Sequence, residues 1–451
     1  MEQELQVFVG IDWGWEEHQL CVLDAEGKLL LERKIAHEVR ALEGVLEEVL
    51  ALAAGNAASV GVAIEIPHGP VVQTLVDAGV KVFALNPKQL DRFRDRFTVA
   101  GAKDDRRDAH VLASALRTDR HAFWPVSLDS AEWAELREET RHYEELRADF
   151  TRLTNRLRQL VGRCFAPLLS IGDVTEPWMW DVLKRGLGPQ GMRKLGQSTI
   201  ERILARHRIR RISAKELQAT LCARSFPLAP GVREGVVRRI LALLPQLKLL
   251  LDQLKQSERR LDRLLERCAQ SSRGASESSL SARPQNEHSD VEILRSLPGV
   301  GRIVCATVLA EAHGVLLQGK RSTLRALGGI APVTRRSGKA HPVVERRRAC
   351  NRRLANAFYH WGRTAVQHDL ACHQHYVRLR QRGHGHARAV RGVVDRLLDV
   401  ALQMLKHRTL YDPARRRPLH TVQLVKEQPP VCANAGCGIG NEASTSCAPL
   451  R

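Results

Sequence analysis

The sequence lacks the features of a membrane-bound or secreted protein. No uninterrupted apolar run approaches about 18 residues, the length that spans a membrane. The first ten residues, MEQELQVFVG, lack the basic start and the long apolar core of a signal peptide. No polybasic segment lies beside a lipid-anchor motif. We therefore expect a cytoplasmic protein without a membrane partner.

Paired cysteine motifs are also absent. Of the 10 cysteines, Cys432, Cys437 and Cys447 lie near the end of the chain, at spacings that match no paired zinc motif. The other cysteines lie in apolar or helical surroundings, where reduced and mostly packed thiols are expected. The cysteines therefore predict no zinc centre.

Acidic and aromatic residues are both scarce. Lys and Arg total 70 against 50 Asp and Glu, which gives a formal net charge of +20. A soluble chain this basic usually binds a polyanion, and nucleic acid is the commonest one. Aromatic residues make up only 4% of the chain. Binding should therefore depend on phosphate contacts more than on base stacking.

The order of the predicted elements divides the chain into five segments. Residues 1–125 show three strands and then helix, strand, helix, strand and helix, which is the order of a ribonuclease-H-like sheet and also occurs in other α/β proteins. Residues 126–270 are helical. Residues 271–290 are rich in Ser and polar residues, as in a flexible linker. Residues 291–412 form a basic, mainly α-helical C-terminal domain, and residues 413–451 are expected to be disordered.

Two heptad stripes in the second segment predict a long antiparallel hairpin or coiled coil. The stripes consist of Trp133, Leu136, Tyr143, Phe150 and Leu157 and of Ile240, Leu247, Leu254 and Leu261. Pro245 lies inside the second stripe, so a helix is expected to start or kink there. The stripes must pack on each other or on another chain, and we expect a homo-oligomer, a dimer or a tetramer. Residues 165–232 read as irregular and basic.

Carboxylates are predicted to meet at one edge of the sheet. Asp12 ends the first predicted strand, and Glu65 ends a strand whose alternation places it on one face with Gly61 and Ala63. In the following helix, Asp105 and Asp108 are three residues apart and share a face, and Asp104 with Asp108 is the competing pair.

Four acids at one edge would repel each other without a cation. Oxygen ligands suit magnesium or manganese, and two such ions can align an in-line displacement at phosphorus. Taken one at a time, the same acids are explained as solvated strand caps or as a surface of ion pairs.

Three stretches resemble the insertion-sequence-110 family of transposases. They are GIDWGWEEHQLCVLD, AIEIPHGP and NPKQLDRFRDRFTVAGAKDDRRDAHVLA. The family carries a RuvC-like domain with a D-E-D-D set of metal ligands. Carried over by motif, the resemblance implies Asp12, Glu65, Asp105 and Asp108 as catalytic residues. The match from Lys103 to Ala109 favours Asp105 over Asp104.

The C-terminal domain carries two further motifs. The turn Leu297–Gly301, LPGVG, resembles half of a helix-hairpin-helix, whose amides can hold a phosphate, although a plain helical connection has the same pattern. The stretch APVTRRSGK resembles the second domain of the same family, which implies that Ser337 is the nucleophile. No general base is identified, and His341 is only close in sequence. The basic residues expected to bind nucleic acid are Lys103, Arg335, Arg336, Lys339, Arg346, Arg347, Arg348, Arg352 and Arg353.

The resemblance implies a DNA transposase or site-specific recombinase that acts on element ends and target DNA. It further implies a covalent phosphoserine intermediate, a structured guide RNA and a place at the bacterial nucleoid. One alternative is a RuvC-like structure-specific nuclease that forms no covalent intermediate. Another is a non-catalytic nucleic-acid-binding protein, in which the acids serve only the fold.

Overall fold

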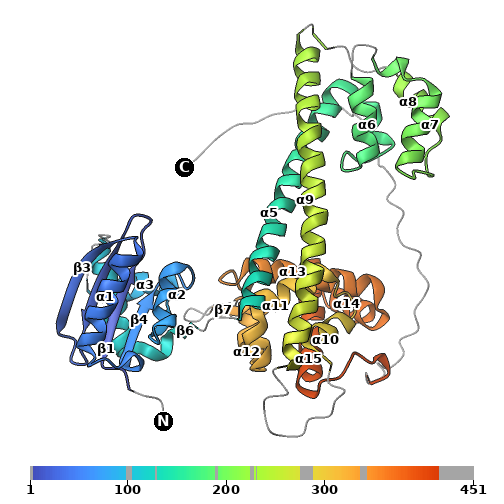
Figure 1. Cartoon of the computed structure of the whole chain (residues 1–451). Coiled ribbons are helices and arrows are strands. Elements are labelled where there is room, and N and C mark those ends of the chain that lie inside the picture. Colours follow the sequence, from blue (N-terminus) through green and yellow to red (C-terminus); the bar gives the residue numbers. More distant parts are fainter. Residues whose placement is uncertain are drawn as a thin grey trace, which may run out of the picture. The chain divides into compact units, whose positions relative to one another are not determined.

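The computed structural model of the chain describes residues 4–97, 104–126, 130–187, 191–223, 228–229, 231–274, 288–335 and 343–415. The chain divides into two compact units, Met1–Cys268 and Ala269–Arg451. The first unit contains a mixed α/β sheet, and the second is mostly helical (Figure 1). These features confirm the coarse fold prediction. Within the described residues no helix is both long and apolar enough to cross a membrane.

A six-stranded sheet begins the first unit, with strand order β3-β2-β1-β4-β5-β6. Strands β1, β4 and β5 run parallel, while β2, β3 and β6 pair antiparallel with their neighbours. The strands are β1 (Val7–Asp12), β2 (Glu17–Leu23), β3 (Leu29–Ala36), β4 (Val60–Ile64), β5 (Lys81–Ala84) and β6 (Trp124–Pro125). The first three strands and the alternation of helix and strand up to β5 follow the predicted order, but two helices follow β5 where one was predicted.

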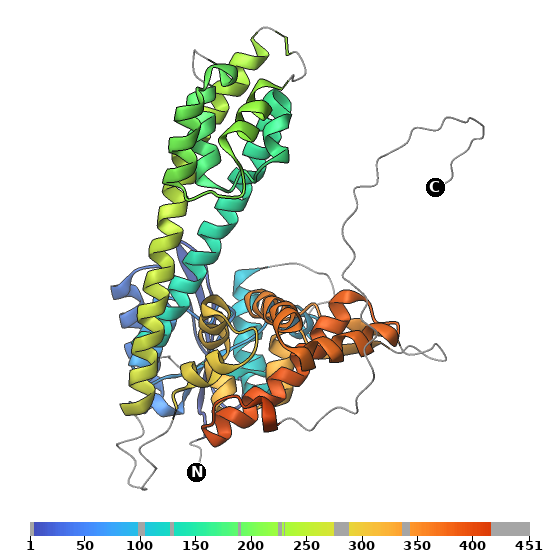
Figure 2. The same cartoon turned by 90° about the vertical axis from the view of Figure 1, so that its right-hand side faces the viewer.

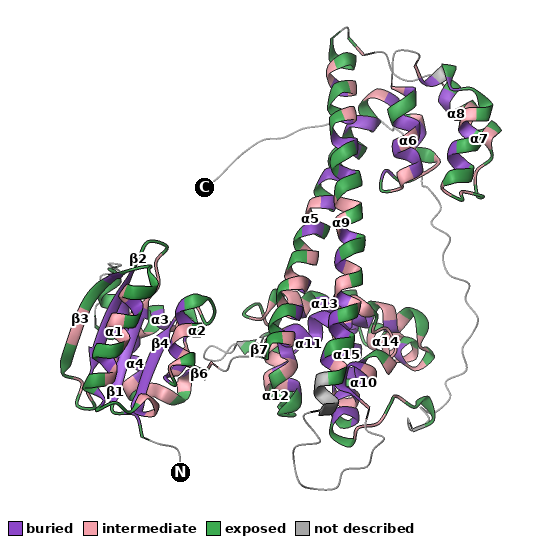
Figure 3. Cartoon of the chain, in the orientation of Figure 1, coloured by how far each residue is buried: buried purple, intermediate pink, exposed green. Residues whose placement is uncertain are grey.

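Two hydrophobic cores cover the two faces of this sheet, because successive side chains of a strand point to opposite sides. Helices α1 (Val39–Leu52) and α2 (Pro70–Asp77) pack over Val9 and Val62. Helices α3 (Pro87–Arg94) and α4 (Asp105–Asp119) pack over the other face. The central strands β1 and β4 are almost wholly buried (Figure 3). Short 3₁₀ turns, η1 (Ala57–Ser59) and η2 (Arg120–Ala122), complete this part.

The two heptad stripes lie on two long helices that pack against each other within one chain (Figures 1 and 2). Helix α5 spans Ala131–Phe165, and α9 spans Val232–Gly274. The helices are antiparallel, because Glu135 pairs with Arg267 whereas Glu139, farther along α5, pairs with Arg260. Leu157, Leu247 and Leu254 are buried in their shared core.

Of the two outcomes expected at Pro245, a helix start is wrong, since α9 begins 13 residues before the proline and continues through it. Proline lacks the amide hydrogen that would bond to the carbonyl of Leu241. The neighbouring Leu243, Leu244 and Leu247 are buried, and this packing stabilises the helix across the missing hydrogen bond.

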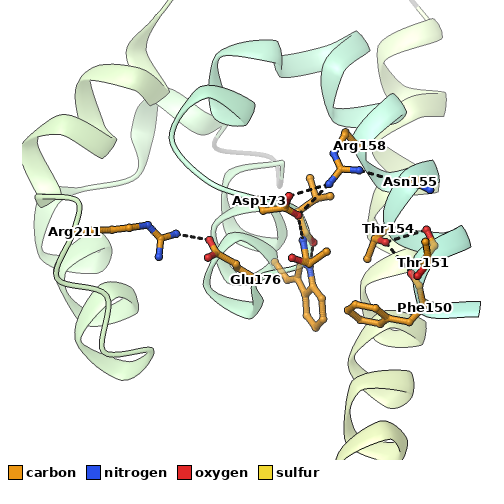
Figure 4. A network of polar contacts seen from close by, with 11 residues as sticks. Phe150, Thr151, Thr154, Asn155, Arg158, Asp173, Glu176 and Arg211 are labelled. Atoms are coloured by element: carbon orange, nitrogen blue, oxygen red, sulfur yellow. Dashed lines mark hydrogen bonds and ion pairs between the residues drawn. The ribbon is translucent and has the colours of Figure 1, made fainter. Parts of the chain in front are cut away.

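Residues 166–222 are more regular than their sequence indicates. They form α6 (Pro177–Gly186), α7 (Gln197–Arg206) and α8 (Ala214–Cys222), with short turns η3 (Ala166–Ser170) and η4 (Met192–Lys194). These helices share one hydrophobic core with α5 and α9, which includes the buried Trp178 and Trp180. Arg158 of α5 binds Asp173, and Arg211 binds Glu176 (Figure 4). The segment therefore caps the hairpin where α5 ends and α9 begins.

The second unit is built mainly from helices. Its elements are α10 (Asp290–Ser296), α11 (Arg302–Leu317), α12 (Arg321–Leu327), β7 (Pro332–Arg335), β8 (Val343–Arg346), α13 (Arg352–His368), α14 (Leu370–Gln381), α15 (His386–His407) and η5 (Pro413–Arg415). Strands β7 and β8 form a separate antiparallel pair. The central helices α11, α13 and α15 bury their apolar faces, with Trp361 and Phe358 almost fully enclosed.

Candidate metal site and nucleic-acid interface

The carboxyl ends of β1 and β4 place Asp12 and Glu65 next to each other in the sheet. Ile11 pairs with Ile64 in parallel register, and Asp12 and Glu65 each follow directly. Both carboxylates are half-buried. Parallel strands deliver the residues after them to the same edge, as the sequence predicts.

Strand alternation puts both side chains on the face covered by α4. Phe8 and Ala63 belong to the core on that face, whereas Ile11 and Ile64 belong to the opposite core. Asp12 and Glu65 are therefore on the same side as Phe8 and Ala63.

Helix α4 approaches the sheet unusually closely because Gly10 and Gly61 leave room for it. A Cβ on Gly10 would lie 1.9 Å from the carbonyl oxygen of Ala109, and a Cβ on Gly61 would lie 3.2 Å from Leu116. Gly61 pairs with Phe8, and Gly10 lies closer than Phe8 to the carboxyl end of β1. Helix α4 therefore runs antiparallel to β1, with its first turn toward Asp12 and Glu65.

The first turn of α4 carries the three remaining acids in different roles. Asp104 is the N-cap, and its side chain accepts a hydrogen bond from the backbone N–H of Arg106 at 3.3 Å. Asp105 is the first helical residue and is exposed, whereas Asp108 is buried at 1% exposure. Asp104 thus has a capping function of its own.

Arg94 of α3 closes over Asp108. Its Nε donates to Oδ1 at 2.6 Å, and its Nη2 donates to Oδ2 at 2.7 Å. The hydrogen bond with Asp108 is the largest effect that raises the pKa of Arg94 above its usual value. Both oxygens of Asp108 are engaged in this bidentate pair, which the sequence analysis did not foresee.

The donor set suits a hard divalent cation only in part. Asp12, Glu65 and Asp105 offer carboxylate oxygens, the ligands that magnesium and manganese prefer. Asp108 can bind the same cation only if Arg94 shares the carboxylate with the ion or moves away from it. In the described residues no three His, Cys, Asp or Glu side chains are close enough together to hold a metal ion. The elements thus bring the acids to one edge without drawing them into a closed site.

The LPGVG turn of the second unit packs against α13. Gly299 has a positive φ of 81°, and a Cβ there would lie 2.5 Å from the backbone nitrogen of Ala365. Trp361 Nε1 donates to the carbonyl oxygen of Pro298 at 2.9 Å. The glycine is therefore required by helix packing, and phosphate binding by this turn stays a prediction.

Several residues predicted for the site lie outside the described part of the chain. They are Lys103, Arg336, Ser337, Lys339 and His341. The last four fall between β7 and β8, where Arg335 pairs with Val343 through the backbone. How Ser337 lies relative to the acids of the first unit therefore stays a prediction.

The described arginines of the second unit include two that the sequence analysis missed. Arg346 and Arg348 are exposed, as is Arg352, while Arg347 and Arg353 are half-buried. On α15, burial and then the charges of Arg346 and Arg388 lower the pKa of Arg391. Arg388 and Arg391 are the two residues that the sequence analysis missed. They are three residues apart, a spacing that puts two side chains on one face of a helix and could have indicated this basic pair.

Acids on and next to α14 and α15 have partners of their own. Asp395 pairs with Arg325, and Asp399 pairs with Arg321. Asp369 caps α14 by accepting from the N–H of Cys372 at 2.7 Å. Arginines that repel one another suit the binding of an anionic group such as a phosphodiester, and nucleic-acid binding here stays a prediction.

Comparisons with protein-family models find a match in each of the two units. A family model described as "Transposase", of the DEDD type named for IS110, matches residues 9–166, and the model "Transposase IS116/IS110/IS902 family" matches residues 291–378. The first match contains all four candidate acids.

Relatives extend the match over nearly the whole chain. A protein named "Putative transposase y4uE", from Sinorhizobium fredii, is 42% identical over 52% of this chain and 64% of its own length. "Mini-circle putative transposase for IS117", from Streptomyces coelicolor, is 31% identical over 92% of this chain and 97% of its own length. "Insertion element IS110 uncharacterized 43.6 kDa protein", from the same species, is 26% identical over 91% of this chain and 96% of its own length. The chain thus belongs to the IS116/IS110/IS902 family of transposases.

Proposed function

We propose that this transposase cuts and rejoins DNA at a divalent-metal site on a RuvC-like, ribonuclease-H-like sheet. The arrangement of the acids carries the proposal: β1, β4 and α4 deliver Asp12, Glu65, Asp105 and Asp108 toward one end of one face. Membership of a DEDD-type transposase family supports the same set. We assign the residues 1–125 to this domain.

Asp12, Glu65 and Asp105 would hold magnesium or manganese, with Asp108 as the fourth ligand or as the anchor of Arg94. Bound ions would polarise a phosphodiester and stabilise the charge that develops as a strand breaks. The number of ions, taken as two, follows from the acid count and the family resemblance.

Ser337 supplies the nucleophile in this proposal. Its Oγ forms a bond to phosphorus as the P–O bond of the strand breaks, its proton is lost, and the departing strand oxygen takes up a proton. The serine ester keeps the phosphodiester's bond energy for rejoining to a second DNA end. Arg335, Arg336 and Lys339 surround Ser337 in sequence and would offset the phosphate charge.

The nucleic-acid partners follow from the family and the charge. Element ends and target DNA are the substrates, and a structured guide RNA is implied by the family resemblance. The basic residues on β8, α13 and α15, beginning with Arg346, would contact phosphates. The linker and the LPGVG turn would let the second unit hold DNA as a helix-hairpin-helix does.

An oligomer stays part of the proposal, on a changed basis. The heptad stripes of α5 and α9 bury each other within one chain, as in a coiled-coil hairpin. They therefore give no reason to expect a second copy. Transposition joins several DNA ends, and this is a reason to expect more than one copy. A dimer or tetramer is therefore expected once nucleic acid is bound.

A labelled DNA substrate with added magnesium tests the function. A covalent protein–DNA adduct supports the proposal. Cleaved DNA without an adduct supports a structure-specific nuclease. If neither cleaved DNA nor an adduct forms, the result supports a protein that only binds nucleic acid. Sequencing any RNA that copurifies with the full-length chain tests the guide.

A further inference from the structure

The helical cap of the α5–α9 hairpin carries a basic edge that the proposed chemistry does not use. From Arg202 to Lys215 the chain holds six Lys and Arg residues and no acid. This stretch, the basic edge, runs from the middle of α7 through the connection to the start of α8. The flanking acids are engaged locally, since Glu201 accepts a hydrogen bond from Gln197 and Glu216 forms the capping box of α8. Positive charge therefore remains in excess even when both flanking acids are counted.

The backbone of the connection between α7 and α8 is held in place. Helix α7 ends in a Schellman motif, in which the N–H of Ile209 donates to the carbonyl oxygen of Leu204 at 2.9 Å. The N–H of Arg208 donates to the carbonyl oxygen of Ala205 at 3.1 Å, which completes the motif. Ile209 and Ile212 pack against the hydrophobic core of the cap. The arginines beside these isoleucines are therefore presented from an ordered backbone.

The cations of the connection fall into two groups. Arg211 pairs with Glu176, the residue before α6 (Figure 4), and Arg206 lies 3.6 Å from a carboxylate of α6. Arg208 and Arg210 are exposed, and neither forms an ion pair with any residue that the structure describes. The first group fastens the connection to the cap, whereas the second leaves two neighbouring charges available to a polyanion in solution.

Arg208 also occupies a position where the fold favours glycine. Its φ is 55°, in the left-handed region, and it is the residue of the Schellman motif that is usually glycine. A side chain with a Cβ is disfavoured in this conformation. The fold therefore does not account for an arginine here, whereas a contact made by its guanidinium group does.

We propose that Arg208 and Arg210 bind the phosphate backbone of duplex DNA, at a contact separate from the candidate metal site. The proposal rests on the proposed function only for the identity of the polyanion. The cap follows the end of α5, a helix of 35 residues and about 50 Å, whereas the sheet with the acids precedes the start of that helix. Guanidinium groups bind phosphates strongly without reading bases, so this contact adds affinity for DNA of any sequence.

Fluorescence anisotropy with a labelled element-end duplex, titrated over a range of salt, tests the contact in the full-length chain. The double variant Arg208→Gly with Arg210→Ala should weaken binding about 10- to 60-fold at about 0.1 M salt and lower the slope of log K against log salt by about 2. Arg208→Gly alone should lower the slope by about 1. Its thermal midpoint should equal or exceed that of the wild type, because glycine relieves the left-handed backbone. A loss of affinity without a loss of stability cannot come from unfolding.

Lys248→Ala with Lys255→Ala is the matched control. Both lysines are exposed on α9 and flank Asp252 at helical spacing, so the control removes the same charge from a face that also carries an acid. It should leave affinity and slope unchanged. An unchanged slope in the arginine double variant, or an equal loss in the lysine control, would overturn the proposal. So would a loss seen with a duplex RNA but not with the DNA. The proposed function fails separately, if the wild-type protein binds DNA but neither cuts it nor forms an adduct.

Discussion

Gly10→Ala tests whether the close packing of α4 on β1 positions the candidate site. The new Cβ would lie 1.9 Å from Ala109 O and 2.6 Å from Ala113 N, both backbone atoms that cannot rotate away. To reach even 3.0 Å from Ala109 O, the helix must retreat by about 1.1 Å. Overpacking of this kind costs about 1–3 kcal/mol. The same shift moves Asp105 and Asp108 away from β1, and a misplacement of about 1 Å can lower a rate about 100-fold.

Urea unfolding and magnesium-dependent strand cleavage measure the two effects. Cleavage is compared at a temperature where circular dichroism shows both proteins folded. Gly44→Ala is the matched control, since Gly44 lies inside α1 and a Cβ there meets nothing within 4 Å. It should stabilise the chain by about 0.5–1 kcal/mol and leave cleavage unchanged. Wild-type stability and cleavage in Gly10→Ala would refute this account of the site.

Three further predictions concern charge. Asp12→Ala should abolish strand cleavage while DNA binding persists or improves, because a repulsive charge is lost; normal cleavage, read on a gel, would remove Asp12 from the site. Arg94→Met should lower the free energy of unfolding by about 3–5 kcal/mol, since it leaves the buried Asp108 unpaired; a loss below about 1 kcal/mol in urea titrations would contradict the pairing. Arg388→Ala with Arg391→Ala should weaken DNA binding and reduce the slope of log K against log salt by about 2; an unchanged slope would place these side chains away from the phosphates.

Local sequence patterns predicted those features of the fold that depend on periodicity and on the order of the elements. The strands around Asp12 and Glu65 follow from alternation and apolar runs, whereas the close approach of α4 to Gly10 was not predicted. The heptads predicted that α5 and α9 would pack. Sequence could not choose between a partner in the same chain and one in another, because a leucine stripe looks the same in both cases.

Contacts between distant residues were not predictable in this way. The pairing of Arg94 with Asp108 depends on how α3 docks beside α4, which no spacing encodes. A helix start at Pro245 was wrong, because the buried leucines on both sides of the proline hold α9 together across the missing hydrogen bond. Arg391 meets Arg346 across 45 residues, so only the fold reveals the shared charge.

Mass spectrometry of the protein–DNA adduct tests the central claim most directly. Full-length protein is incubated with labelled element-end DNA and magnesium, digested with protease and nuclease, and mapped. The account predicts a phosphonucleotide on Ser337 that is absent in Ser337→Ala and in Asp12→Ala. An adduct that persists in Ser337→Ala on another residue, or that forms equally well in Asp12→Ala, would contradict it.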